Sequence, residues 1–144
     1  MAGSEKTGSR VIAVRGEPNV DEQKQASAAI TPGHLIEVNA GKWRKHATAS
    51  GAAGPWFALE RDELGQGIDV AYAALDYIKA GFFKTGERVN AIVDSGSTFV
   101  DGAELESDGA GRLKAGTTKP IARAAYDKSP SSAAGGDRLV VIIL

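Results

Sequence analysis

The sequence predicts an all-β protein. We expect a small, compact antiparallel β-barrel or β-tulip-like body with short strands, at most one short helix and an extended N-terminal arm. Three observations support this: short apolar runs are separated by turn residues, glycine accounts for 18 of the 144 residues, and the chain ends on the β-branched run RLVVIIL. Glycine adopts positive φ without steric cost, so closely spaced glycines favour tight turns between strands.

The first 30 residues differ from the rest, because the first aromatic residue of the chain is Trp43. This composition predicts a segment that buries too little apolar surface to order by itself. Two interpretations stay open: a disordered tail, or an arm that adds as a strand to a partner's sheet edge. The chain then divides into an arm (1–30) and a body (31–144). The contact residues of the arm would be Val11, Ile12, Ala13, Val14 and Arg15.

The body opens with Pro32-Gly33, a pair that suits a type II turn. Strands are expected at 34–38, 43–48 and 56–59, the first two joined as a hairpin. The next segment is ambiguous. Its apolar residues Ile68, Tyr72, Leu75 and Ile78 recur at helical spacing, which favours a short helix over 69–75, followed by a strand over 76–83.

The second half of the body reads as short strands separated by Gly, Asp and Ser turns. The strands are expected at 82–83, 89–93, 98–100, 103–106, 112–114 and 119–126. Residues 127–136 are expected to form a loop. The last eight residues contain an almost unbroken β-branched run, which is typical of a strand buried on both faces, so we expect a central strand there.

Composition excludes several classes of function. A net charge of −1 provides no electrostatic attraction to nucleic acid or an acidic membrane, so neither is expected as a partner. With no cysteine, the chain has no disulfide, thiolate nucleophile or cysteine-ligated metal. The N-terminus lacks an apolar signal region, and no window approaches the roughly 18 apolar residues of a membrane helix. We expect a soluble, non-secreted single domain.

The string Asp94-Ser95-Gly96-Ser97, preceded by apolar residues, resembles the catalytic loop of aspartic proteases. That chemistry needs two facing carboxylates that share a proton, so a chain with one copy would have to dimerise, as retroviral-type proteases do. No flap-like hairpin is evident. The preferred interpretation is a hairpin turn in which Asp94 caps backbone amides, and a dimeric protease using Asp94 remains the alternative.

Other candidates for chemistry are sparse. The chain has two histidines, His34 and His46, and no cysteine or nearby acidic cluster, so no metal site is predicted. No Ser-His-Asp set or cofactor loop can be assembled, and we therefore expect neither an enzyme nor a cofactor. Trp43 and Trp56 leave open a carbohydrate- or cell-surface-binding β-module.

The body also resembles the small capsid decoration (cement) proteins of tailed bacteriophages. The resemblance is carried by the order and spacing of ITPGHLIE (30–37), KHATA (45–49), GIDVAYAA (67–74), GFFKTGERV (81–89), LESDGAGRLK (105–114), IARA (121–124) and the terminal β run. It implies an all-β body on the outer surface of the phage head, commonly a homotrimer at local three-fold positions. Such a protein would bridge neighbouring major capsid proteins, and the family has no catalytic residues.

Overall fold

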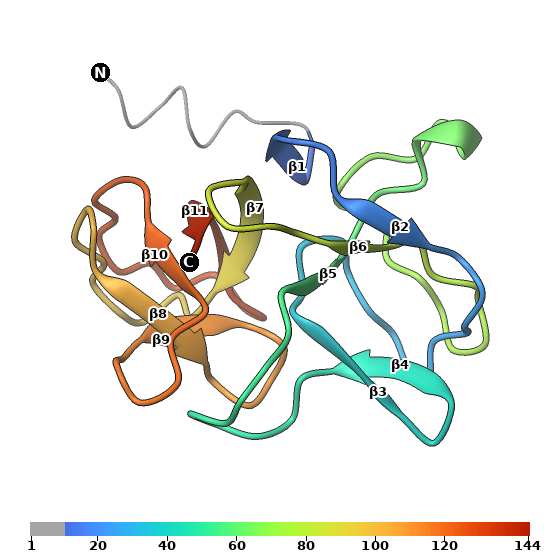
Figure 1. The fold of residues 1–144 in the computed structure, drawn as a ribbon, viewed down its shortest axis with the longest axis horizontal. Coiled ribbons are helices and arrows are strands. Elements are labelled where there is room, and N and C mark those ends of the chain that lie inside the picture. The colour runs from blue at the N-terminus through green and yellow to red at the C-terminus, as the bar shows by residue number, and fades with distance from the viewer. Residues whose placement is uncertain (1–10) are drawn as a thin grey trace.

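The computed structural model describes residues 11–144, and almost all of its regular structure is β (Figure 1). The all-β fold class predicted from the sequence is therefore confirmed. The elements are β1 (Ala13–Arg15), β2 (Asn19–Asp21), β3 (Ile36–Asn39), β4 (Lys42–Lys45), β5 (Trp56–Ala58), the 3₁₀ turn η1 (Asp62–Leu64), β6 (Ala80–Phe82), β7 (Arg88–Val93), β8 (Glu104–Ser107), β9 (Leu113–Ala115), β10 (Ala122–Ala124) and β11 (Asp137–Ile143).

The C-terminal half of the chain forms a closed five-stranded barrel. Its strands follow the order β7-β11-β10-β8-β9, and a parallel pairing of Val93 with Leu113 joins β9 back to β7. The terminal run is a central strand, as predicted, because β11 pairs along β7 on one side and with β10 on the other. Closure leaves the barrel strands without a long open edge.

The apolar side chains of the barrel strands point inward and meet residues from the N-terminal half. The core contains residues of the barrel strands, such as Val89, Leu105 and Val141, together with Ile12, Leu35, Phe57 and Phe83 from outside the barrel. Phe57 and Phe83 pack edge to face with ring centroids 5.8 Å apart. The N-terminal half is thereby fastened to the barrel by its own large side chains.

A second lobe lies beside the barrel (Figure 1). It consists of the sheet β2-β6-β5 and the hairpin β3-β4, and it encloses a smaller core around Trp43, Tyr72 and Ile78. The Tyr72 hydroxyl donates to the Leu59 carbonyl at 2.8 Å and accepts from the Lys79 amide at 3.2 Å. The buried hydroxyl is therefore satisfied, and it ties the irregular segment 65–79 to the lobe.

The helix predicted over 69–75 is wrong. This segment is irregular: Tyr72 forms an antiparallel bridge with Ile30, and Leu75 has φ +71° and an exposed side chain. Tyr72 and Ile78 are buried because the segment crosses the second core, and the helical spacing of its apolar residues is a coincidence of that path. The helical turn that does form is η1, within an acidic stretch.

Several predicted strands are shorter or weaker in the structure. The strand expected at 98–100 is a single bridge between Phe99 and Lys128. The strands expected at 76–83 and 119–126 are reduced to Ala80–Phe82 and Ala122–Ala124.

The predicted division between an arm and a body at residue 30 is not a structural boundary among the described residues. β1 pairs with β7, and β2 pairs with β6 of the same chain. Ile12 is fully buried in the barrel core, while Ala26 and Ile30 are buried in the second core. A few apolar residues are enough to order this segment, because they are buried in cores that the rest of the chain forms. The part of the predicted arm before Val11 lies outside the described residues.

Candidate functional site: an N-terminal interaction edge

Residues 11–21, here called the N-terminal edge, run along one side of both sheets. β7 is paired with β11 along one of its edges, and three separate segments share its other edge. Along that second edge, Asn90 N donates to Ile12 O at 2.8 Å, Ile92 N to Gly33 O at 3.0 Å and Asp94 N to Leu113 O at 2.9 Å. The N-terminal edge therefore completes hydrogen bonding that the barrel leaves open.

The turn between β1 and β2 is held against the body by Glu87. One oxygen of the Glu87 carboxylate accepts from the Glu17 amide at 2.9 Å, and the other accepts from the Lys84 amide at 2.8 Å. Gly16 has φ +101°, which favours glycine, and a Cβ at this position would displace the Glu87 carboxylate from the turn. This turn fixes the direction in which the edge leaves β1.

The outward side of the N-terminal edge is apolar for a surface. Val11, Val14 and Val20 are exposed by 46%, 37% and 48%. β1 and β2 are the terminal strands of their sheets, so within residues 11–144 their outer edges have no strand neighbour. Terminal strands with exposed β-branched residues are templates for addition of a further strand. Of the predicted contact residues, Val11, Val14 and Arg15 are thus exposed, whereas Ile12 is committed to the core.

Asp94 caps its own turn. Its carboxylate accepts from the Ser97 hydroxyl at 2.9 Å and from the Gly96 amide at 3.1 Å. These bonds, the one from Ser97 foremost, lower the pKa of Asp94 below its usual value. The geometry therefore matches the hairpin-turn interpretation of the Asp-Ser-Gly-Ser string.

The two tryptophans pack into the second lobe rather than forming an open platform. Trp43 is only 1% exposed, and its ring centroid lies 5.1 Å from that of Trp56. Trp56 in turn lies 5.0 Å from Phe82. Because its ring faces are covered, Trp43 is not available to stack on a sugar or a base.

The fold brings together a serine, a histidine and a carboxylate that lie far apart in the sequence. The Ser107 hydroxyl lies 2.6 Å from His46 Nδ1, and Glu37 Oε1 lies 3.6 Å from Nε2, which donates to the Ala52 carbonyl at 2.9 Å. Ser107 is 0% and His46 2% exposed, so no substrate reaches the hydroxyl. The set is a buried structural network, and the sequence carries no local signal for it.

Neither metal-ligating residues nor known relatives identify a further site in residues 11–144. In the part of the chain that the structure describes, no group of three or more His, Cys, Asp or Glu residues is arranged to hold a metal ion. No helix within residues 11–144 is long and apolar enough to cross a membrane. Comparison with protein-family models and with curated proteins gives no match.

Proposed function

We propose that this protein is a structural binding module, a capsid decoration (cement) protein of a tailed bacteriophage. It would bind the outer surface of the head, bridge neighbouring major capsid proteins and stabilise the expanded, DNA-filled particle. The observation that supports this best is the N-terminal edge. It presents exposed valines on two terminal strands while its own backbone is anchored to the barrel by Ile12 and Glu87.

The mode of binding that fits this edge is strand addition. A partner strand lying along β1 or β2 would satisfy outward backbone groups and cover Val14 or Val20. Anchoring matters because an edge that is already ordered loses little conformational entropy on binding. In this proposal the predicted arm still contacts the partner, but through exposed residues such as Val11 and Val14 and not through the buried Ile12.

The proposal further includes a homotrimer at local three-fold positions of the head. Three linked copies would each contribute a weak contact, and the second and third contacts would form at high effective concentration. A closed barrel with a second lobe fastened to its core is suited to transmit load between capsid subunits without local unfolding. The binding surface, rather than any catalytic group, would then carry the function.

The experiment is a binding assay on expanded heads that lack the protein. Val14→Lys and Val20→Lys place charges on the N-terminal edge at exposed positions that do not affect the core. We expect head occupancy to fall at least about tenfold, equivalent to about 1.4 kcal/mol. Val38→Lys and Val100→Lys are matched controls, because these valines are 50% and 60% exposed elsewhere. Equal occupancy by edge and control variants would refute the assigned surface.

A further inference from the structure

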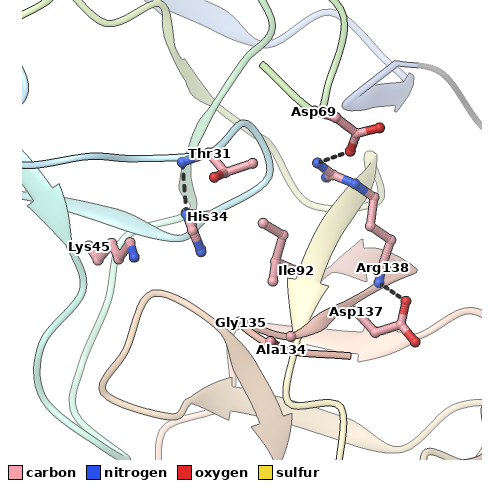
Figure 2. A pocket seen from close by; sticks show the side chains of 10 residues that line it. Thr31, His34, Lys45, Asp69, Ile92, Ala134, Gly135, Asp137 and Arg138 are labelled. Atoms are coloured by element: carbon pink, nitrogen blue, oxygen red, sulfur yellow. Dashed lines mark hydrogen bonds and ion pairs between the residues drawn. The ribbon is translucent and has the colours of Figure 1, made fainter. Parts of the chain in front are cut away.

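A cavity of about 410 Å³ lies between the barrel and the segments that lead into the second lobe (Figure 2). Its walls come from widely separated parts of the chain: the turn 31–34, the end of β4, the barrel strand β7 and the start of β11. The side chains that matter for its chemistry are His34, Lys45 and Arg138, with Asp69 at the rim. None of them belongs to the N-terminal edge.

His34 presents one fixed hydrogen-bond donor to this cavity. The Thr31 amide donates to His34 Nδ1 at 3.0 Å, so the proton of the neutral ring is on Nε2. In Figure 2 that second nitrogen points away from Thr31 into the space between Lys45 and Ile92. Burial, reinforced by the positive charges of Lys45, Arg138 and Arg112, lowers the pKa of His34 to about 3. At neutral pH the ring is therefore an uncharged N–H donor in a positive field.

Lys45 adds a charge that no carboxylate in residues 11–144 neutralises, since no ion pair involves it. Its neighbour Arg44, by contrast, is bonded to Glu37 at 2.8 Å. The aliphatic part of Lys45 packs against Gly111: a Cβ built on Gly111 would lie 2.8 Å from Lys45 Cβ. In Figure 2 the Lys45 ammonium group points toward His34. Lys45 is a solvent-exposed residue, and its ammonium lines the cavity without an ion-pair partner among the described residues.

Arg138 contributes a second, weakly compensated charge from β11. Its Nη2 donates to the Ile68 carbonyl at 2.8 Å, and its ion-pair partner Asp69 lies 3.6 Å away with a side chain that is 90% exposed. Nη1 is buried and has no hydrogen-bond partner among the described residues. Burial lowers the pKa of Arg138, which is the response of a guanidinium that lacks full compensation.

The remaining charges near the cavity are already paired. Asp137 accepts from Ser131 at 2.9 Å and forms an ion pair with Lys128 at 3.2 Å, and Figure 2 shows its carboxylate directed away from His34. Arg112 is bonded to Asp108 at 2.6 Å. The positive charge at the cavity therefore comes chiefly from Lys45 and Arg138. The negative charges that act on Arg138 are those of the exposed Asp69 and of Glu60, which accepts from the Ile12 amide at 3.4 Å.

We propose that this cavity is a binding site for a small oxyanion, the carboxylate or phosphate group of a small molecule, with Lys45 and His34 Nε2–H as direct donors and Arg138 as a source of positive charge. An oxyanion supplies acceptors for both donors together with the missing negative charge. A cation is repelled by the same field, and a neutral molecule leaves the charges uncompensated. This site is independent of the proposed capsid function.

The test is an NMR titration of the full chain at neutral pH and constant ionic strength, with sodium phosphate in one series and sodium acetate in the other. We expect saturable shifts of the His34 ring and Arg138 signals, and a higher pKa of His34 in the saturated sample. Lys45→Met should weaken binding at least about tenfold, or about 1.4 kcal/mol. Lys42→Met is the matched control, because residues 42 and 45 point to opposite faces of β4.

Saturation by either probe at these signals supports the site, and the tighter probe identifies it as a carboxylate or a phosphate site. Shifts that grow linearly with both anions would overturn the proposal. So would Lys45→Met binding as tightly as Lys42→Met. A comparison of backbone spectra before titration establishes that both variants are folded, so that lost binding reports the cavity and not the fold.

Discussion

Replacing His34 by glutamine should remove a pH dependence of stability that the wild-type protein shows below about pH 6.5. His34 is 5% exposed, and its pKa falls from 6.5 to about 3 in the folded state, chiefly through burial. The unfolded chain therefore binds a proton at this residue before the folded chain does. The stabilisation is complete above the unfolded pKa and is lost progressively as pH falls toward the folded value.

The magnitude follows from the two pKa values. Between pH 7 and pH 5 the unfolded state gains most of one proton while the folded state stays neutral, so the free energy of unfolding should fall by about 2 kcal/mol from this residue alone. Glutamine of similar size retains an oxygen that can accept from the Thr31 amide, but it does not titrate. The fall in the free energy of unfolding between pH 7 and pH 5 should therefore be about 2 kcal/mol smaller in the variant.

The assay is urea denaturation of both proteins at pH 7 and pH 5, in a buffer without phosphate or carboxylate so that the cavity stays free of added oxyanion. Carboxylates titrate equally in the two proteins, and their contribution cancels in the difference between them. We expect the wild type to lose about 2 kcal/mol more than His34→Gln over this interval. Equal losses would refute the lowered pKa of His34 in the folded state.

Three further predictions test the fold by denaturation. Ile12→Ala should lower the free energy of unfolding by about 2–5 kcal/mol, because it leaves a cavity in the barrel core. Val20→Ala, at an exposed position, should lower it by less than about 0.5 kcal/mol. A similarly small loss for both variants would mean that Ile12 is not part of the core. Asp94→Ala should lower the free energy of unfolding by about 1–2 kcal/mol at pH 7, because two capping hydrogen bonds are lost. The difference in stability from the wild type should shrink as the pH falls through the lowered pKa of Asp94. Acid-dependent peptide cleavage by the wild type would contradict the role of Asp94 as a turn residue. Tyr72→Phe should cost about 1–3 kcal/mol, because the buried Leu59 carbonyl loses its donor, and an unchanged unfolding midpoint would contradict that bond.

The fold class and most of the barrel strands could be predicted from residues that lie close together in the sequence. Turn residues on either side predicted β7, and the β-branched run predicted β11, because both signals lie within a few residues of the strand itself. The turn at Asp94 was likewise predicted from its own residues, since Asp and Gly side-chain chemistry acts over two or three positions. The helix over 69–75 failed because burial of Tyr72 depends on Ile30, which is remote in sequence.

The sequence left the N-terminal segment open between a disordered tail and an arm that adds as a strand to a partner, whereas in the structure β1 pairs with β7 of the same chain. Ile12 is buried because part of one edge of β7, next to the barrel core, is left for it to pair with. This opening results from the order of the strands in the sheet, which the composition of the segment does not reveal. The same holds for Lys45 and Arg138, which no pattern in the sequence connects to His34. They meet His34 at one cavity because non-local strand pairing sets distances between segments, whereas sequence patterns report only on neighbours along the chain.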